Sequence, residues 1–117
     1  MAEYKRLTLE EVGDVTVVRF LGNRIIDNLH IQELGQELFQ LVETEGCKKL
    51  LLDFKSVDFL GSAALGKLIT LDKKVKQHKG VLKLSSIQQE ILEVFRITKL
   101  DRLFDIREDE ADALAAF

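Results

Sequence analysis

Hydrophobic residues in this chain cluster in short runs that predict strands. Runs 7–9 and 15–20 are rich in β-branched and apolar residues, as strands are. The Gly13-Asp14 pair between them is a turn signal, so we expect the two runs to form a β-hairpin. Run 50–54 is almost continuously apolar, which is typical of a strand buried on both faces of a helix-flanked sheet.

Apolar residues that recur at three- and four-residue steps predict two long helices. The first has an N-cap at Asp27 or Asn28 and stops at Gly46. The second spans about 62–77 and ends at Gly80. Both carry an apolar stripe on one side and polar residues on the other, so each is expected to cover a sheet.

The last third of the chain predicts two further strands and two shorter helices. We expect strands at 81–84 and 103–106. Between them Ser86 opens a third helix, with Gln89 at the third position of a capping box. A last helix is predicted over 108–116, where acidic residues suit the positive N-terminal end.

This alternation of strands and helices predicts an α/β fold. After the opening hairpin, each strand is separated from the next by a helix, which favours a mostly parallel central sheet with an antiparallel N-terminal hairpin strand and about four flanking helices. The length of 117 residues fits one domain, taken here as 1–117. Partners of such sheets meet the loops at the carboxyl ends of the strands, here the segment after Phe54.

Composition narrows the class of protein further. Hydrophobic residues make up 46% and charged residues 32% of the chain, which suits a soluble domain with a real core. No apolar run approaches the ~20 residues that cross a bilayer, and the polar start 1–6 is unlike a signal peptide. We therefore expect a cytoplasmic protein without membrane insertion. The single cysteine, Cys47, forms no internal disulfide, and a net charge of −3 gives no general attraction to nucleic acid.

Candidate catalytic and metal-binding motifs are missing from the sequence. It contains neither a Gly-x-Gly-x-x-Gly nor a Walker phosphate loop. His30 and His78 are far apart and have no companions at metal-ligand spacing. We expect no catalytic residue, no metal and no cofactor, and keep an enzyme on the same α/β scaffold as the alternative class.

The start of the second predicted helix is the strongest candidate site. Gly61, Ser62, Ala63 and Ala64 form a cluster of small residues that lets a partner's backbone approach closely. The N-terminus of a helix favours an anion, and a phosphate on Ser62 would add about −1.5 to −2 charges there. The alternative is that Ser62 is simply the N-cap of this helix.

The same residues carry a family resemblance that covers nearly the whole chain. Segments 22–27, 50–53, 57–66 and 100–104 resemble, in this order, the STAS domain of bacterial anti-sigma factor antagonists and of the cytoplasmic ends of sulfate transporters. The resemblance implies a partner switch. The antagonist binds an anti-sigma factor, usually a serine kinase. The kinase phosphorylates a hydroxyl residue in the family's signature loop, here the signature segment 57–66, and so ends binding, and a phosphatase resets it.

Within this signature Ser62 aligns with the first hydroxyl position and Ala63 with the second. The family usually has aspartate where Gly61 stands and glycine where Ala64 stands. The resemblance therefore implies phosphorylation at Ser62, with Ser56 as the weaker choice. The alternative is a non-phosphorylated binding subunit of a transporter or of a larger signalling assembly.

The expected partner surface extends beyond the phosphorylation site. We expect it to include Asp27, Asp53, Asp58, Gly61, Ser62, Ala63 and Lys67. Each charged member also has a purely structural interpretation: Asp27 as an N-cap, Asp53 as a cap of the loop, Asp58 as the start of a turn, and Lys67 as part of a solvated helix face.

Overall fold

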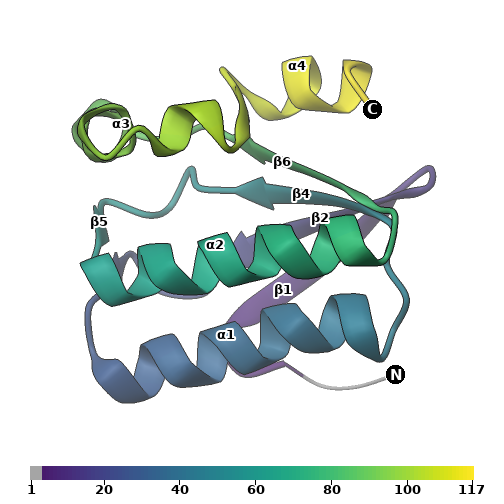
Figure 1. Cartoon of the computed structure of the whole chain (residues 1–117), viewed down its shortest axis with the longest axis horizontal. Coiled ribbons are helices and arrows are strands. Elements are labelled where there is room, and N and C mark those ends of the chain that lie inside the picture. Colours follow the sequence, from purple (N-terminus) through teal and green to yellow (C-terminus); the bar gives the residue numbers. More distant parts are fainter. Residues whose placement is uncertain (1–3) are drawn as a thin grey trace.

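A five-stranded sheet forms the centre of the computed structural model, which describes residues 4–117. Its order is β1-β2-β4-β6-β7, with β1 antiparallel to β2 and every other pair parallel (Figure 1). The predicted hairpin edge and parallel sheet are confirmed. The strands are β1 (Leu7–Val12), β2 (Val15–Phe20), β4 (Lys49–Asp53), β6 (Val81–Ser85) and β7 (Asp105–Arg107).

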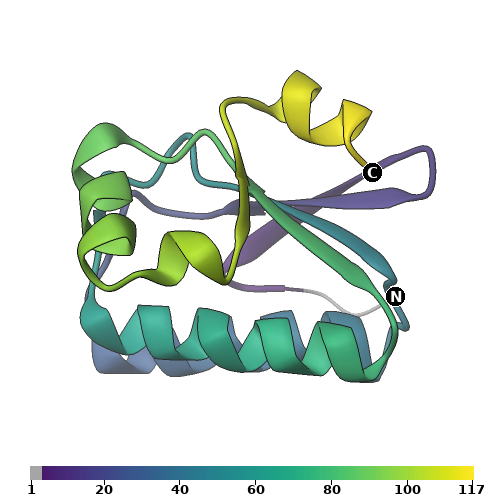
Figure 2. The same cartoon turned by 45° about the horizontal axis from the view of Figure 1, so that its top comes forward.

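Four helices cover the two faces of this sheet unequally. They are α1 (Asn28–Glu43), α2 (Ser62–Gln77), α3 (Gln89–Ile97) and α4 (Glu110–Ala115). The first three connect parallel strands that follow one another across the sheet, so right-handed crossovers place them on the same side. Helix α4 follows the edge strand and packs on the opposite face (Figure 2).

Strand β4 is buried on both faces, as its sequence predicts. Leu50 and Leu52 belong to the large core under the helices α1, α2 and α3. Leu51 points the other way, into a small core with Val15, Val17 and Ala113 of α4. The three leucines of β4 are completely inaccessible to solvent.

A second, two-stranded sheet was not predicted. Its strands, β3 (Arg24–Ile25) and β5 (Phe59–Leu60), are parallel and lie beyond the carboxyl end of the main sheet. Two residues are too few to show the alternation by which a strand is recognised in a sequence. The predicted element order therefore lacks both strands.

Three predicted boundaries near the C-terminus are wrong. Helix α3 begins at Gln89 behind the N-cap Gln88, and Ser86 has a left-handed φ of 59°, so Ser86 neither opens the helix nor forms a capping box. A short 3₁₀ helix, η1 (Leu100–Arg102), moves β7 two residues later than predicted. Helix α4 is shorter than predicted because Asp109 is its N-cap and accepts a hydrogen bond from the Asp112 N–H at 2.8 Å.

Replacing Phe54 by alanine should destabilise the fold strongly. Its ring is fully buried and lies 4.9 Å from the ring of Phe20, so Phe54→Ala leaves a cavity and should lower the free energy of unfolding by about 3–5 kcal/mol. Phe59 is 42% exposed, and Phe59→Ala should cost about 1 kcal/mol or less. Urea denaturation measures both, and equal losses would contradict this assignment of the core.

Candidate functional site

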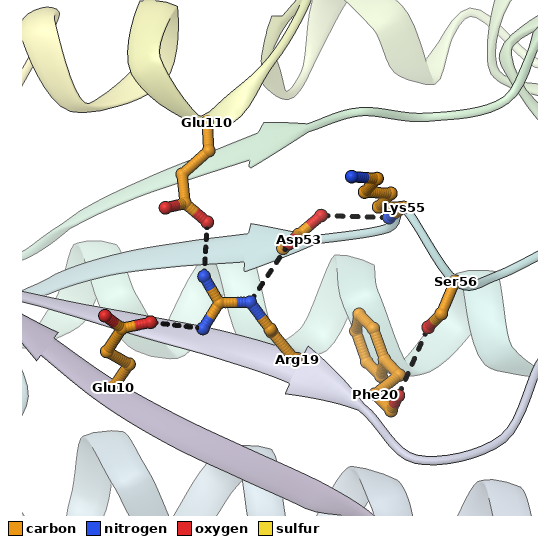
Figure 3. Close-up of polar contacts among 7 residues, drawn as sticks. All are labelled: Glu10, Arg19, Phe20, Asp53, Lys55, Ser56 and Glu110. Atoms are coloured by element: carbon orange, nitrogen blue, oxygen red, sulfur yellow. Dashed lines mark hydrogen bonds and ion pairs between the residues drawn. The ribbon is translucent and has the colours of Figure 1, made fainter.

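The site begins where β4 ends, at the Asp53 carboxylate. One oxygen accepts the Lys55 N–H at 2.9 Å, and the other lies 3.3 Å from Nε of Arg19 on the neighbouring strand. The Arg19 guanidinium also bonds Glu10 and Glu110, each at 2.6 Å (Figure 3). Asp53 thus starts the loop after β4, and Arg19 joins that point to β1 and α4.

The loop then runs along the end of β2. The Ser56 hydroxyl donates to the Phe20 carbonyl at 3.2 Å, and Val57 is buried and bonds back to the Phe54 carbonyl at 3.0 Å. Ser56, the weaker candidate for phosphorylation, therefore has a structural role at the base of the loop (Figure 3).

Backbone hydrogen bonds fasten the signature segment to β3 and to Asn23, the residue before it. The N–H groups of Asp58 and Phe59 both donate to the Asn23 carbonyl, at 2.8 and 3.3 Å. The Gly61 N–H donates to the Ile25 carbonyl at 2.8 Å. The Asp58 carboxylate adds a side-chain bond from the Asn23 amide at 3.0 Å. This ladder holds β5 and places the start of α2 at the surface.

Gly61 allows this close approach and is also the N-cap of α2. A Cβ at Gly61 would lie only 3.3 Å from the Ile25 carbonyl oxygen. The tight packing of β3 and β5 at this point therefore depends on the absence of a side chain at residue 61. The N-cap has no side-chain hydrogen bond, and Ser62 is the first residue of the helix. The interpretation of Ser62 as the N-cap is therefore wrong. Ser62 and Ala63 are both exposed.

Three apolar side chains are exposed in the segments that border the start of α2. Helices α1 and α2 lie side by side with their N-termini at the same end of the molecule (Figure 1). Ile26 and Leu29, around the start of α1, are 45% and 63% exposed, and Phe59 of β5 is 42% exposed. Asp27 occupies the N-cap position of α1 as predicted but makes no side-chain capping bond there. Asp27 is exposed to solvent.

Lys67 lies on a different side of α2 from Ser62. Five residues separate the two, which is about 140° around a helix axis. The Lys67 stem packs against Gly35 of α1, where an added Cβ would come within 2.8 Å of its Cδ. Its ammonium is 6.0 Å from the centre of the Phe39 ring. The structure thus brings Asp27, Asp58, Gly61, Ser62 and Ala63 to one edge and places Lys67 in the seam between the helices.

Other reactive side chains do not assemble into a site. Within residues 4–117 no group of three histidine, cysteine or acidic side chains is arranged to hold a metal ion. Cys47 is a free, half-buried thiol near the Thr16 hydroxyl. None of the helices in the described part of the chain is long and apolar enough to cross a membrane.

The sequence belongs to the STAS domain family, which it matches over residues 6–113. BtrV of Bordetella bronchiseptica, whose name places it among anti-sigma factor antagonists, is 25% identical over 112 residues, covering 96% of this chain and 94% of BtrV. An anti-sigma factor antagonist from Mycobacterium paratuberculosis shares the fold with a TM-score of 0.81 at 26% identity, over 94% of this chain and 91% of that one. The phosphorylated form of Bacillus SpoIIAA has a TM-score of 0.70 at 15% identity, over 94% and 97%.

His30 should make the fold less stable in mild acid. Burial, together with the charge of Arg6, lowers the pKa of His30, and its Nε2 is buried without a hydrogen-bond partner. The unfolded chain, with an ordinary histidine pKa of about 6.5, therefore takes up this proton first, and stability falls as the pH drops through that value.

Between pH 7.5 and 5.5, His30→Gln should lose less unfolding free energy than the unmodified protein. His78→Gln, at an exposed position, is the matched control and should follow the unmodified protein. Urea denaturation at several pH values measures the difference. Parallel pH profiles for His30→Gln and the unmodified protein would rule out this role of His30.

Proposed function

We propose that this chain is an anti-sigma factor antagonist that docks an anti-sigma factor on the surface around Ser62 and is released by phosphorylation of that serine. One observation carries the proposal. Ser62 is exposed at the first position of α2, and the neighbouring segments leave the apolar side chains of Ile26, Leu29 and Phe59 exposed as well. A modification there changes the surface that a partner covers and leaves the core untouched.

Phosphorylation at this position suits the domain itself. The first N–H groups of a helix have no partner within the helix, and the N-cap Gly61 supplies no side-chain bond. A phosphate on Ser62 would interact favourably with these N–H groups and with the helix dipole. It would also place about −1.5 to −2 charges beside an apolar surface, which opposes burial of that surface by a partner.

The relatives support this function. BtrV carries the name of an anti-sigma factor antagonist, and SpoIIAA has a phosphorylated form. The partner is then an anti-sigma factor with serine kinase activity, and a phosphatase restores the unmodified serine. The chain acts by binding and supplies the acceptor hydroxyl, while the chemistry belongs to the partner.

Ala63 favours a second candidate function, that of a binding subunit without phosphorylation. It removes the second hydroxyl of the signature, while Gly61 replaces the usual aspartate, and neither change affects the exposed apolar side chains. A binding subunit of a transporter or larger signalling assembly that is never phosphorylated would keep this docking surface. Phosphate transfer distinguishes the two functions.

Incubation with the cognate anti-sigma kinase and ATP should transfer one phosphate to Ser62. Mass spectrometry locates it, Ser62→Ala should abolish it, and Ser56→Ala is the matched control that should retain it. Stable binding without any transfer would favour the non-phosphorylated subunit. Transfer to Ser56 would contradict the assignment of the site.

A negative charge on the docking surface should weaken partner binding without unfolding the protein. Ser62→Glu and Leu29→Asp should each lower the affinity for the anti-sigma factor at least about tenfold, as is typical of central interface positions. Val81→Asp is the control, because Val81 is 43% exposed at the amino end of β6, the opposite end of the sheet. Calorimetric titration measures the affinity, and equal effects of Leu29→Asp and Val81→Asp would refute this location.

A further inference from the structure

A small pocket opens between the signature segment and α3. Its walls come from both elements, and its floor includes the buried Leu65 and Ile91. Its volume is about 210 Å³. The lining residues are Asp58, Phe59, Leu60, Leu65, Glu90, Ile91 and Val94.

The volume of this pocket limits what can occupy it. Sites for small molecules and cofactors usually measure about 300–1,000 Å³. The pocket beside α3 is smaller and has room for one long side chain. Leu60 and Leu65 lie two and three residues from Ser62 in the chain, so the pocket borders the surface on which we propose that a partner docks.

The residues that line the pocket carry charge of one sign, and the nearby Arg24 guanidinium lies over the Phe59 ring at 5.0 Å from its centre. Asp58 and Glu90 are both exposed and line it together with apolar side chains, and no cationic residue lines it. Among residues 4–117 neither carboxylate forms an ion pair, and Asp58 accepts only the neutral Asn23 amide. On the same helix, Glu93 is already paired with Arg96 at 2.6 Å.

We propose that this pocket receives one arginine side chain of the docked partner. An arginine has an aliphatic stem, which fits the apolar walls, and a planar guanidinium, which bonds carboxylates in bidentate geometry. Lysine matches the charge but has neither the planar fork nor the weaker hydration of a guanidinium. That the partner supplying this arginine is an anti-sigma factor rests on the proposed function.

A blocked peptide tests the pocket independently of the partner. The full chain, labelled with ¹⁵N, is titrated with acetyl-Ala-Arg-Ala-amide, and with the same peptide carrying citrulline, which has nearly the shape of arginine without its charge. We expect saturable amide shifts at Phe59, Leu60, Ile91 and Val94 with the arginine peptide, and at least fivefold weaker binding of the citrulline peptide. Absence of saturable shifts at these residues, or equal binding of both peptides, overturns the proposal.

Substitutions of Glu90 and Asp58, with one control, test whether these two carboxylates bind the arginine. Glu90→Gln should weaken the arginine peptide at least threefold, and adding Asp58→Asn should weaken it further. Glu93→Gln, on the same helix but outside the pocket, should change nothing. The Glu90→Gln result is the more direct test, because Asp58 also accepts a hydrogen bond from Asn23 and its substitution removes that contact as well. Equal effects of Glu90→Gln and Glu93→Gln contradict a specific contact in the pocket.

Titration with the anti-sigma factor separates this proposal from the proposed function. If the partner binds the chain but is unaffected by Glu90→Gln and Asp58→Asn, the arginine contact is wrong and the antagonist function stands. If the arginine peptide saturates the pocket while the anti-sigma factor does not bind, the pocket stands and the proposed function fails.

Discussion

The burial of β4 on both faces is the constraint on which the rest of this structure depends. Its three leucines pack into two cores at once, so the charged residues of the strand, Lys49 and Asp53, stand only at its two ends. Asp53 is the first charged residue after the leucines, and it pairs with Arg19. The loop that carries the signature therefore leaves the sheet at a fixed point and in a fixed direction.

Arg19 connects that point to the rest of the domain. Its guanidinium bonds carboxylates from β1, β4 and α4, so the short C-terminal helix is held next to the base of the loop. Most of these groups are partly exposed, and such ion pairs contribute little stability individually. These ion pairs matter more for the position of the loop than for stability. They orient Asp53, whose other oxygen accepts the Lys55 N–H in the first turn of the loop.

The signature segment is held firmly along its backbone, while several of its side chains remain at the surface. Hydrogen bonds to Asn23 and Ile25 fasten its backbone, and Gly61 permits the close contact. Ser62, Phe59 and Asp58 are all left exposed. The surface is thus preorganised, and a protein that docked there, as we propose, would lose little free energy in ordering it. Under the proposed function, a charge at Ser62 on this surface would act on the docked protein and leave the fold unchanged.

The sequence by itself determined the main sheet, the two long helices and the position of the signature loop, because apolar periodicity and a continuous buried run such as Leu50–Leu52 depend mostly on nearby residues. It also indicated Ser62 and the small residues around it. Only the tertiary structure showed that Gly61 and not Ser62 is the N-cap, that Lys67 turns toward α1, and that Asp58 and Glu90 share one pocket. The two-residue strands β3 and β5 and the start of α3 also needed the structure. Each of these features depends on contacts between residues far apart in the chain, which leave no local pattern to read.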